Sequence, residues 1–311
     1  MQDRSHDDQD ASRRLLERVA AALADELERP LQPGLYLVAT PIGNLADISL
    51  RALAVLSRAD LIAAEDTRHS RKLLSHFGLR GELTAYHEHN AAKERPRLLA
   101  RIRAGFSAAL ISDAGMPLVS DPGYKLVREA LEAGLTVTSV PGASAALAAL
   151  TSAGLPTDTF LFAGFLPPKG GQRRKRLEEL KPVPATLIFY ETASRLQATL
   201  ADMAGIYGGR EAAVAKELTK LHESLVRGTP AELAAAIDPS TELKGEFVVL
   251  VGPPSPDEGL VDDDAIVASL KLALKHESFR DAVRGVAETF DLKRSRVYEL
   301  GLALKPKERE P

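Results

Sequence analysis

Hydrophobic positions along the chain alternate between two spacings, one typical of buried strands and one typical of helices. Between Gly34 and Gly154, short apolar runs predict strands at 35–39, 61–64, 83–86, 108–111 and 135–140. Apolar residues at helical spacing predict helices at 49–56, 71–77, 90–104, 124–133 and 145–154. This alternation of strand and helix indicates a mostly parallel sheet covered by helices.

The same alternation starts again after Pro156. Apolar runs predict strands at 159–163, 186–190, 212–215 and 246–251, and helices are expected at 173–180, 195–207 and 231–237. We therefore expect a second α/β domain with its own sheet.

The two ends of the chain follow other patterns. The first ten residues are expected to be disordered, and an apolar stripe on a helix at 12–27 would pack on the body or on a partner. After a Pro-rich linker, helices are expected at 264–276, 279–290 and 295–304, the last two resembling a helix-turn-helix. The predicted organisation is an N-terminal extension (1–33), two α/β domains (34–155 and 156–254), the linker (255–262) and a helical tail (263–311).

Composition excludes several classes of protein. The 311 residues include no cysteine, which excludes disulfides, thiolate catalysis and zinc sites built on sulfur. A formal net charge of -3 argues against a globally basic protein, and 5% aromatic residues argue against a stacked single-strand binding platform. Because no apolar run is long enough to span a membrane and the acidic N-terminus lacks the order of a signal peptide, we expect a cytoplasmic protein.

Three turns rich in glycine and proline follow predicted strands, at 40–47, 112–123 and 141–144. In the longest of them, Asp121 before Pro122 predicts the N-cap of the following helix. All three turns would lie at the carboxyl edge of the sheet, where open α/β sheets bind ligands. Because the chain has no G-x-x-x-x-G-K-[ST] and no G-x-G-x-x-G sequence, these turns predict a cleft for a flat or extended small ligand rather than a phosphate loop.

Six segments in unbroken order carry a resemblance to a known family. They are Thr40–Leu45, Ala64–Arg68, Ser112–Gly123, Pro141–Ser144, Gly164–Pro167 and Lys216–Glu223. Together they resemble the ribosomal RNA small subunit methyltransferase I family of the tetrapyrrole methylase superfamily, whose members are 16S rRNA cytidine-2′-O-methyltransferases. The resemblance implies two α/β domains of tetrapyrrole-methylase type, a cofactor cleft between them, and a homodimer. It also implies S-adenosylmethionine-dependent 2′-O-methylation of a cytidine ribose in the decoding region of 16S rRNA, with the small ribosomal subunit as partner.

In that superfamily the cofactor is held largely by main chain from loops that match the turns above. The residues that the resemblance places at the cofactor are Pro41, Gly43, Asn44, Asp113, Ala114, Gly115, Pro117, Ser120, Asp121, Pro141, Gly142, Ser144, Ala145, Phe165 and Leu166. Two positions depart from the family pattern near these segments. Met116 stands where threonine is usual, and Ala193–Ser194 stands where the family has proline and histidine.

A ribose hydroxyl is a weak acid, so a general base or a neutralising cation is expected near it. Lys216 and Glu217, at the end of a second-domain strand, are the first candidates, with a structural ion pair as the alternative, and Glu191 is a further candidate. His87 and His89 would share a strand face, but with no third ligand at a recognisable spacing we expect no metal site.

Basic residues suggest where RNA would bind. The run 169–176 predicts phosphate contacts or, alternatively, a solvated helix face. The candidates for contact with RNA are Lys169, Arg173, Arg174, Lys175, Asp66, Arg68, Arg195, Lys293 and Arg294. Three rival functions remain open: a tetrapyrrole-precursor C-methyltransferase, a non-catalytic RNA-binding protein, and a sensor of S-adenosylmethionine.

Overall fold

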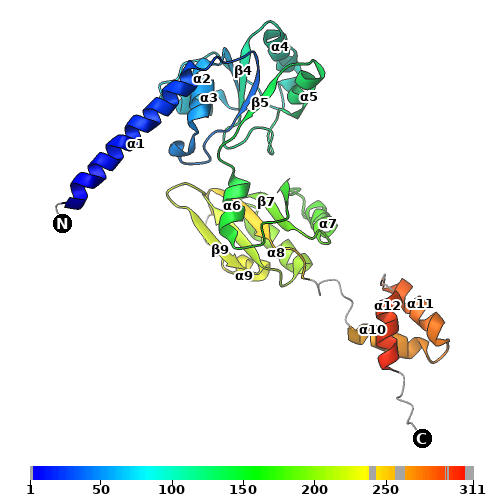
Figure 1. Cartoon of the computed structure of the whole chain (residues 1–311). Coiled ribbons are helices and arrows are strands. Elements are labelled where there is room, and N and C mark those ends of the chain that lie inside the picture. Colours follow the sequence, from blue (N-terminus) through cyan, green and yellow to red (C-terminus); the bar gives the residue numbers. More distant parts are fainter. Residues whose placement is uncertain (1–2, 238–242, 256–262, 291, 293, 305–311) are drawn as a thin grey trace. The chain divides into compact units, whose positions relative to one another are not determined.

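The computed structural model describes residues 3–237, 243–255, 263–290, 292 and 294–304. The chain divides into two compact units, residues 1–253 and residues 254–311. The first unit holds two sheets with their covering helices, and the second holds a small group of helices (Figure 1).

The first sheet is wholly parallel. Its strands are β1 (Gly34–Val38), β2 (Leu61–Ala64), β3 (Leu83–Ala85), β4 (Ser107–Ile111) and β5 (Val137–Val140). They lie in the order β3-β2-β4-β1-β5, each paired in parallel with its neighbours. Strands β2 and β4 are buried along their whole length, as expected for central strands covered by helices on both faces.

Helices follow the strands of this sheet, beginning and ending close to the predicted positions. They are α2 (Leu50–Arg58), α3 (Thr67–His76), α4 (Ala91–Arg103), α5 (Tyr124–Glu132) and α6 (Ala145–Ala153), with a short 3-10 turn at Leu45–Asp47. Helix α5 begins at Tyr124 as predicted, but its N-cap residue differs from the prediction. Its N-cap is Gly123, with φ of 138°, so the expectation that Asp121 caps the helix is wrong. Glycine tolerates this φ, so the helix begins only after Gly123 and the Asp121 carboxylate lies outside it.

The second sheet is mixed. Its strands are β6 (Phe160–Phe165), β7 (Thr186–Thr192), β8 (Ala212–Lys216), β9 (Ser224–Gly228) and β10 (Glu246–Val251), in the order β6-β7-β10-β8-β9. Only the pair β6–β7 is parallel, and β10 runs antiparallel to both β7 and β8. Helices α7 (Gly170–Leu180), α8 (Leu196–Tyr207) and α9 (Pro230–Ala235) pack on this sheet over a core that includes Phe189, Leu200 and Val249.

Strand β6 contains a bulge. Its register with β7 shifts between Phe162 and Gly164, so six residues of β6 lie opposite the five residues 186–190. Gly164 adopts φ of 66°, a conformation open to glycine, and the position of a Cβ there would lie 3.2 Å from the Ser120 hydroxyl. The bulge therefore lies against the long loop of the first sheet.

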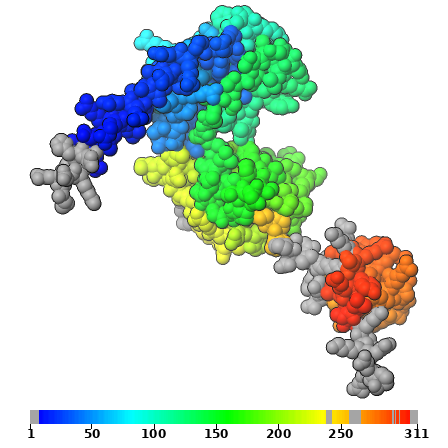
Figure 2. Space-filling view, viewed as in Figure 1, coloured from blue at the N-terminus to red at the C-terminus, as the bar shows by residue number. Residues whose placement is uncertain are grey.

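Helix α1 (Asp3–Glu28) is longer than predicted, since it begins at Asp3 rather than at Ser12. Its C-terminal end packs on α2, where the Arg58 guanidinium donates to the carbonyl oxygen of Leu27 at 2.8 Å. Leu15 and Leu16 of the apolar stripe are exposed, and the helix stands away from the rest of its unit in Figure 2.

The second unit forms its own small core. Helices α10 (Asp263–Ala273), α11 (Phe279–Thr289) and α12 (Arg294–Ala303) bury Leu270, Val283 and Val297 among others. The predicted linker lies almost wholly outside the described residues. Of the helices that the structure describes, none has the length and apolar character needed to cross a membrane.

Candidate functional site

A cavity of about 350 Å³ opens where the loops of the first sheet meet the second sheet within residues 1–253. Its walls come from the turns that follow β1, β4 and β5 and from strands β6, β7, β8 and β10. The lining residues are Ile42, Asp113, Ala114, Gly115, Met116, Val119, Ser120, Asp121, Ser144, Ala145, Phe165, Tyr190, Glu191, Thr192, Ala215, Leu218, Gly245, Glu246, Phe247 and Val248. This volume falls within the range of small-molecule sites.

The first two turns are tied to each other by main-chain hydrogen bonds. The Thr40 amide donates to the Gly115 carbonyl at 2.9 Å, and the Gly115 amide donates to the Thr40 carbonyl at 3.0 Å. The Thr40 hydroxyl also donates to the Ser112 carbonyl at 3.1 Å. These bonds fix the position of the cavity wall before any ligand binds, which reduces the entropic cost of binding.

The long loop after β4 also carries backbone strain. Leu118 and Ser120 have φ of 73° and 67°, left-handed values that side chains other than glycine rarely adopt. Such strain persists only where the surroundings hold the backbone, and it is concentrated at functional sites. Here it directs Ser120 and Asp121 to the cavity wall.

The second sheet contributes an aromatic wall. The rings of Phe165 and Tyr190 both line the cavity, with centroids 5.6 Å apart in an edge-to-face arrangement. Burial raises the pKa of the Tyr190 phenol, which keeps it protonated. These rings can pack against a flat group and shield it from water.

The charged lining of the cavity is acidic. Asp113, Asp121, Glu191 and Glu246 line it, and no lysine, arginine or histidine is among the lining residues that the structure describes. Burial and the nearby Glu65 carboxylate raise the pKa of Asp121 to about 6. The pKa of Glu65 is itself raised by burial and by Asp113. The cavity is thus suited to a ligand that carries positive charge.

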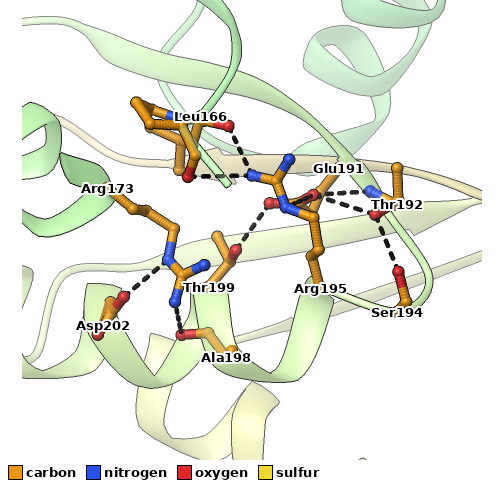
Figure 3. Close-up of polar contacts among 10 residues, drawn as sticks. Leu166, Arg173, Glu191, Thr192, Ser194, Arg195, Ala198, Thr199 and Asp202 are labelled. Carbon is orange, nitrogen blue, oxygen red and sulfur yellow. Dashed lines mark hydrogen bonds and ion pairs between the residues drawn. The ribbon is translucent and has the colours of Figure 1, made fainter. Parts of the chain in front are cut away.

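Glu191 has contacts with Thr192, Thr199 and Arg195 (Figure 3). Its side chain is fully buried, and it accepts hydrogen bonds from the Thr199 hydroxyl at 2.7 Å and from the Thr192 amide at 2.8 Å. Arg195 forms an ion pair with it at 3.2 Å and donates to the Leu166 carbonyl at 2.6 Å. This network ties the segment after β6 to the end of β7, which favours a structural role for both Glu191 and Arg195.

Lys216 and Glu217 do not line the cavity, although Ala215 and Leu218 beside them do. Glu217 pairs with Lys220 at 3.0 Å and accepts from the Glu246 amide at 3.0 Å. These hydrogen bonds, to Lys220 first, lower the pKa of Glu217. The structure therefore supports the alternative of a structural ion pair, but with Lys220 as the partner rather than Lys216.

The structure gathers about half of the expected cofactor residues at the cavity. Those that line it are Asp113, Ala114, Gly115, Ser120, Asp121, Ser144, Ala145 and Phe165. Those that lie outside its lining are Pro41, Gly43, Asn44, Pro117, Pro141, Gly142 and Leu166. Gly43 and Asn44 instead meet the loop after β8, where the Asn44 amide donates to the Thr219 hydroxyl at 3.1 Å. Of the two departures from the family pattern, Met116 lines the cavity.

The expected RNA-binding residues differ in their surroundings. Lys169, Arg174 and Lys175 are exposed at the start of α7. Arg173 differs from the expectation, because it is buried and its guanidinium pairs with Asp202 at 2.7 Å, which leaves it unable to reach a phosphate (Figure 3).

Further RNA candidates lie elsewhere. Asp66 caps α3 and pairs with the exposed Arg68, whose hydrogen bonds lower the pKa of Asp66 to about 2. In the second unit Arg294 is exposed and pairs with Glu288 at 3.2 Å, while Lys293 lies outside the described residues.

Glu191 of β7 was a candidate from the sequence, but Tyr190, Thr192 and the start of β10 were not. Tyr190 and Thr192 lie at the end of β7, Gly245 lies just before β10, and Glu246 to Val248 begin β10. They come together because β10 runs antiparallel to β7, with Glu246 opposite Thr192. The apolar run of β10 was visible in the sequence, but its direction was not.

Comparison with known proteins places the chain among methyltransferases. Residues 34–234 match the family of Tetrapyrrole (Corrin/Porphyrin) Methylases. The chain is 56% identical over 250 residues to Ribosomal RNA small subunit methyltransferase I of Mesorhizobium japonicum, which covers 80% of this chain and 84% of that protein. The protein of the same name from Pseudomonas aeruginosa is 46% identical over 275 residues, covering 86% of this chain and 96% of the relative.

Solved structures share the fold. Uroporphyrin-III-C-methyltransferase from Thermus thermophilus has a TM-score of 0.53 at 22% identity, over 71% of this chain and 94% of that one. Diphthine synthase has a TM-score of 0.53 at 16% identity, over 70% of this chain and 89% of that one. The predicted fold class, two α/β domains of tetrapyrrole-methylase type with C-terminal helices, is confirmed.

Proposed function

The chain belongs to the tetrapyrrole methylase family and, within it, to the ribosomal RNA small subunit methyltransferase I group, and from this membership we propose its reaction. It transfers a methyl group from S-adenosylmethionine to the ribose 2′-hydroxyl of a cytidine in the decoding region of 16S rRNA. The observation that carries the proposal is the identity of 43–56% to proteins named for this small-subunit activity, over most of their length.

The cavity fits the cofactor in charge and in shape. A sulfonium cation and an ammonium group suit a lining whose charged residues are all acidic, and an adenine ring suits the apolar and aromatic walls. Ala114, Gly115, Ser144 and Ala145 would hold the cofactor through main chain and small side chains. When bound, it supplies a methyl group that is already activated by the positive sulfur. The residues of this chain then need to orient the hydroxyl, exclude water and accept a proton.

The same charge pattern weighs against a tetrapyrrole precursor as substrate. Such precursors carry several carboxylates, and a cavity whose charged lining is Asp113, Asp121, Glu191 and Glu246 would repel them. The likeness to uroporphyrin-III-C-methyltransferase is a likeness of fold, at 22% identity.

Phosphate contacts with the RNA are proposed for Lys169, Arg174 and Lys175. These residues are exposed, and they follow the lining residue Phe165 closely in the sequence. Arg294 and Lys293 of the tail are proposed to add contacts with the ribosomal subunit. We also propose that the chain acts as a homodimer in the cytoplasm, where assembling small subunits are found.

Transfer of labelled methyl groups to small ribosomal subunits that lack the modification tests the function. The expected product is 2′-O-methylcytidine at one site of the decoding region, identified by mass mapping of nucleosides. A Ser144→Arg variant, which places a cation in the acidic cavity, should lose cofactor binding and transfer. Thr151→Arg, on the exposed face of α6, whose N-cap is Ser144, should retain both cofactor binding and transfer. Cofactor binding without transfer to any RNA would instead favour the sensor.

A further inference from the structure

We propose that Asp121 is the general base that accepts the proton of the attacking hydroxyl. This role rests on the proposed function, and it differs from the cofactor contact that the family resemblance suggests for the same residue. Asp121 lines the cavity from the long loop after β4, and the left-handed Ser120 just before it fixes the direction of the chain.

The carboxylate is free for this role because α5 does not use it. The helix begins at Tyr124 after the N-cap Gly123, and no side chain caps it. Had Asp121 been the N-cap, its oxygens would accept main-chain hydrogen bonds and the group would be a weaker base.

The other acidic residues of the cavity are engaged elsewhere. Glu191 is surrounded by donors and pairs with Arg195. Glu246 pairs with Lys220 at 2.9 Å, and Asp113 accepts from the Asp66 amide at 3.1 Å. Each of these three carboxylates is therefore held by a partner within the fold.

Two carboxylates that face Asp121 raise its pKa. Glu65 follows β2 and Asp113 follows β4, and both carboxylates disfavour a further negative charge at Asp121. The Ser112 side chain lowers the pKa of Asp121 and opposes this effect only in part. Tyr190, on the other wall, stays protonated, and His87 lies close enough to Glu65 to affect its titration. A carboxylate that protonates near pH 6 is well matched to general-base work close to neutral pH.

In the proposed step, a proton moves to Asp121 and a methyl group moves to the ribose oxygen. The oxygen–hydrogen bond of the ribose breaks and its proton passes to the Asp121 carboxylate, while the oxygen electron pair forms the new bond to the methyl carbon. The carbon–sulfur bond breaks with its electrons returning to sulfur, which leaves a neutral thioether. Protonated Asp121 then releases its proton to solvent.

The first test is the Asp121→Asn variant. Its kcat for methyl transfer should fall by about 10²- to 10⁴-fold, while its affinity for S-adenosylmethionine, measured by calorimetry, should change by less than about threefold. Asp158→Asn, the same change at an exposed position outside the cavity, is the matched control. Loss of cofactor affinity with little loss of kcat would show that Asp121 is a cofactor contact instead.

The second test uses Glu65→Gln, which changes a residue outside the cavity lining. Removing this like charge should lower the pKa of Asp121, measured by carbon-13 NMR of labelled carboxyl groups, and move the acidic limb of the kcat–pH profile to lower pH by the same amount. Ser112→Ala should move both in the opposite direction.

The outcomes separate this inference from the proposed function. If the wild-type chain transfers no methyl group to small subunits, the proposed function fails and the role of Asp121 fails with it. If the wild type is active and Asp121→Asn retains its rate, or the NMR titration and the acidic limb do not move together, the role of Asp121 alone is overturned.

Discussion

Two carboxyl groups on the same cavity, Asp121 and Glu191, show how surroundings divide reactive from structural residues. Glu191 receives hydrogen bonds from a hydroxyl and a main-chain amide and lies beside a guanidinium. Asp121 has the Ser112 side chain and two like charges, Glu65 and Asp113, near it. The sequence marked both residues as candidates, but only the structure shows which donors each one has.

The raised pKa of Asp121 predicts a pH dependence of stability. Because the folded chain holds this proton more tightly than the unfolded chain, the free energy of unfolding should fall as pH rises from about 4 to about 6. Asp121→Asn should remove this slope and stabilise the chain at pH 7 by about 1 kcal/mol, since solvent screening reduces the full effect of the shift. Urea unfolding of both proteins at several pH values measures this; an unchanged slope would contradict it.

Glu191 should matter for stability. Glu191→Ala leaves Arg195 without its carboxylate and removes the acceptor of Thr199, so we expect the free energy of unfolding to fall by about 3 kcal/mol. Glu179→Ala breaks an exposed ion pair with Arg176 and should cost less than about 1 kcal/mol. Equal losses in urea unfolding would speak against a buried network at Glu191.

At the scale of elements, helix α7 shows that a run of basic residues can include a buried one. Arg173, Leu177 and Leu180 are buried on one face of the helix, while Arg174 and Lys175 are exposed. The spacing of Arg173 from the two leucines was visible in the sequence and could have indicated its burial. Composition hid this signal, because all four residues 173–176 are basic.

Because Arg173 is buried and Lys175 is exposed, substitution of Arg173 should reduce stability and substitution of Lys175 should reduce RNA binding. Lys175→Ala should leave stability unchanged but weaken binding to small subunits and reduce the slope of log K against log salt by about 0.7–0.9. Arg173→Ala should instead lower the melting temperature, because it leaves the Asp202 carboxylate largely buried and deprived of its main partner. Thermal unfolding and binding at several salt concentrations separate the two effects. A salt slope for Lys175→Ala equal to that of the wild type would exclude a phosphate contact by Lys175.

Most elements were predictable from spacing, but one strand and the direction of another were not. Strand β9 was missed, since Ser224–Gly228 mixes polar and apolar residues and lies at a sheet edge where burial is incomplete. The antiparallel course of β10 depends on long-range pairing that local patterns do not encode. The loops of the cavity and its residues Phe165 and Glu191 were therefore anticipated, while the contribution of β10 was not.

At the scale of the whole chain, the cavity and both sheets lie within residues 1–253, and residues 254–311 have their own core. Binding of a small molecule and binding of a large partner can therefore be separated by truncation. The exposed leucines of α1 belong to the first unit and lie outside the cavity lining.

A chain that ends at Pro253 should bind S-adenosylmethionine with unchanged affinity, since it keeps every lining residue of the cavity. Its KM for small ribosomal subunits should rise by at least about tenfold if the tail supplies part of the phosphate contacts. Calorimetry and methyl-transfer kinetics measure the two quantities, with the full chain as control. An unchanged KM would show that the tail has no part in docking.

The bulge in β6 also bears on how the length of this protein can vary. Six residues, Phe160 to Phe165, lie opposite the five residues 186–190, so Ala163 has no partner of its own. Deletion of Ala163 would let the backbone straighten while Phe162 stays opposite Ile188 and Phe165 stays opposite Tyr190. A deletion within β7 would instead displace its pairing with two strands at once. Among relatives of different length, the loss of one residue is thus less disruptive in β6 than in β7.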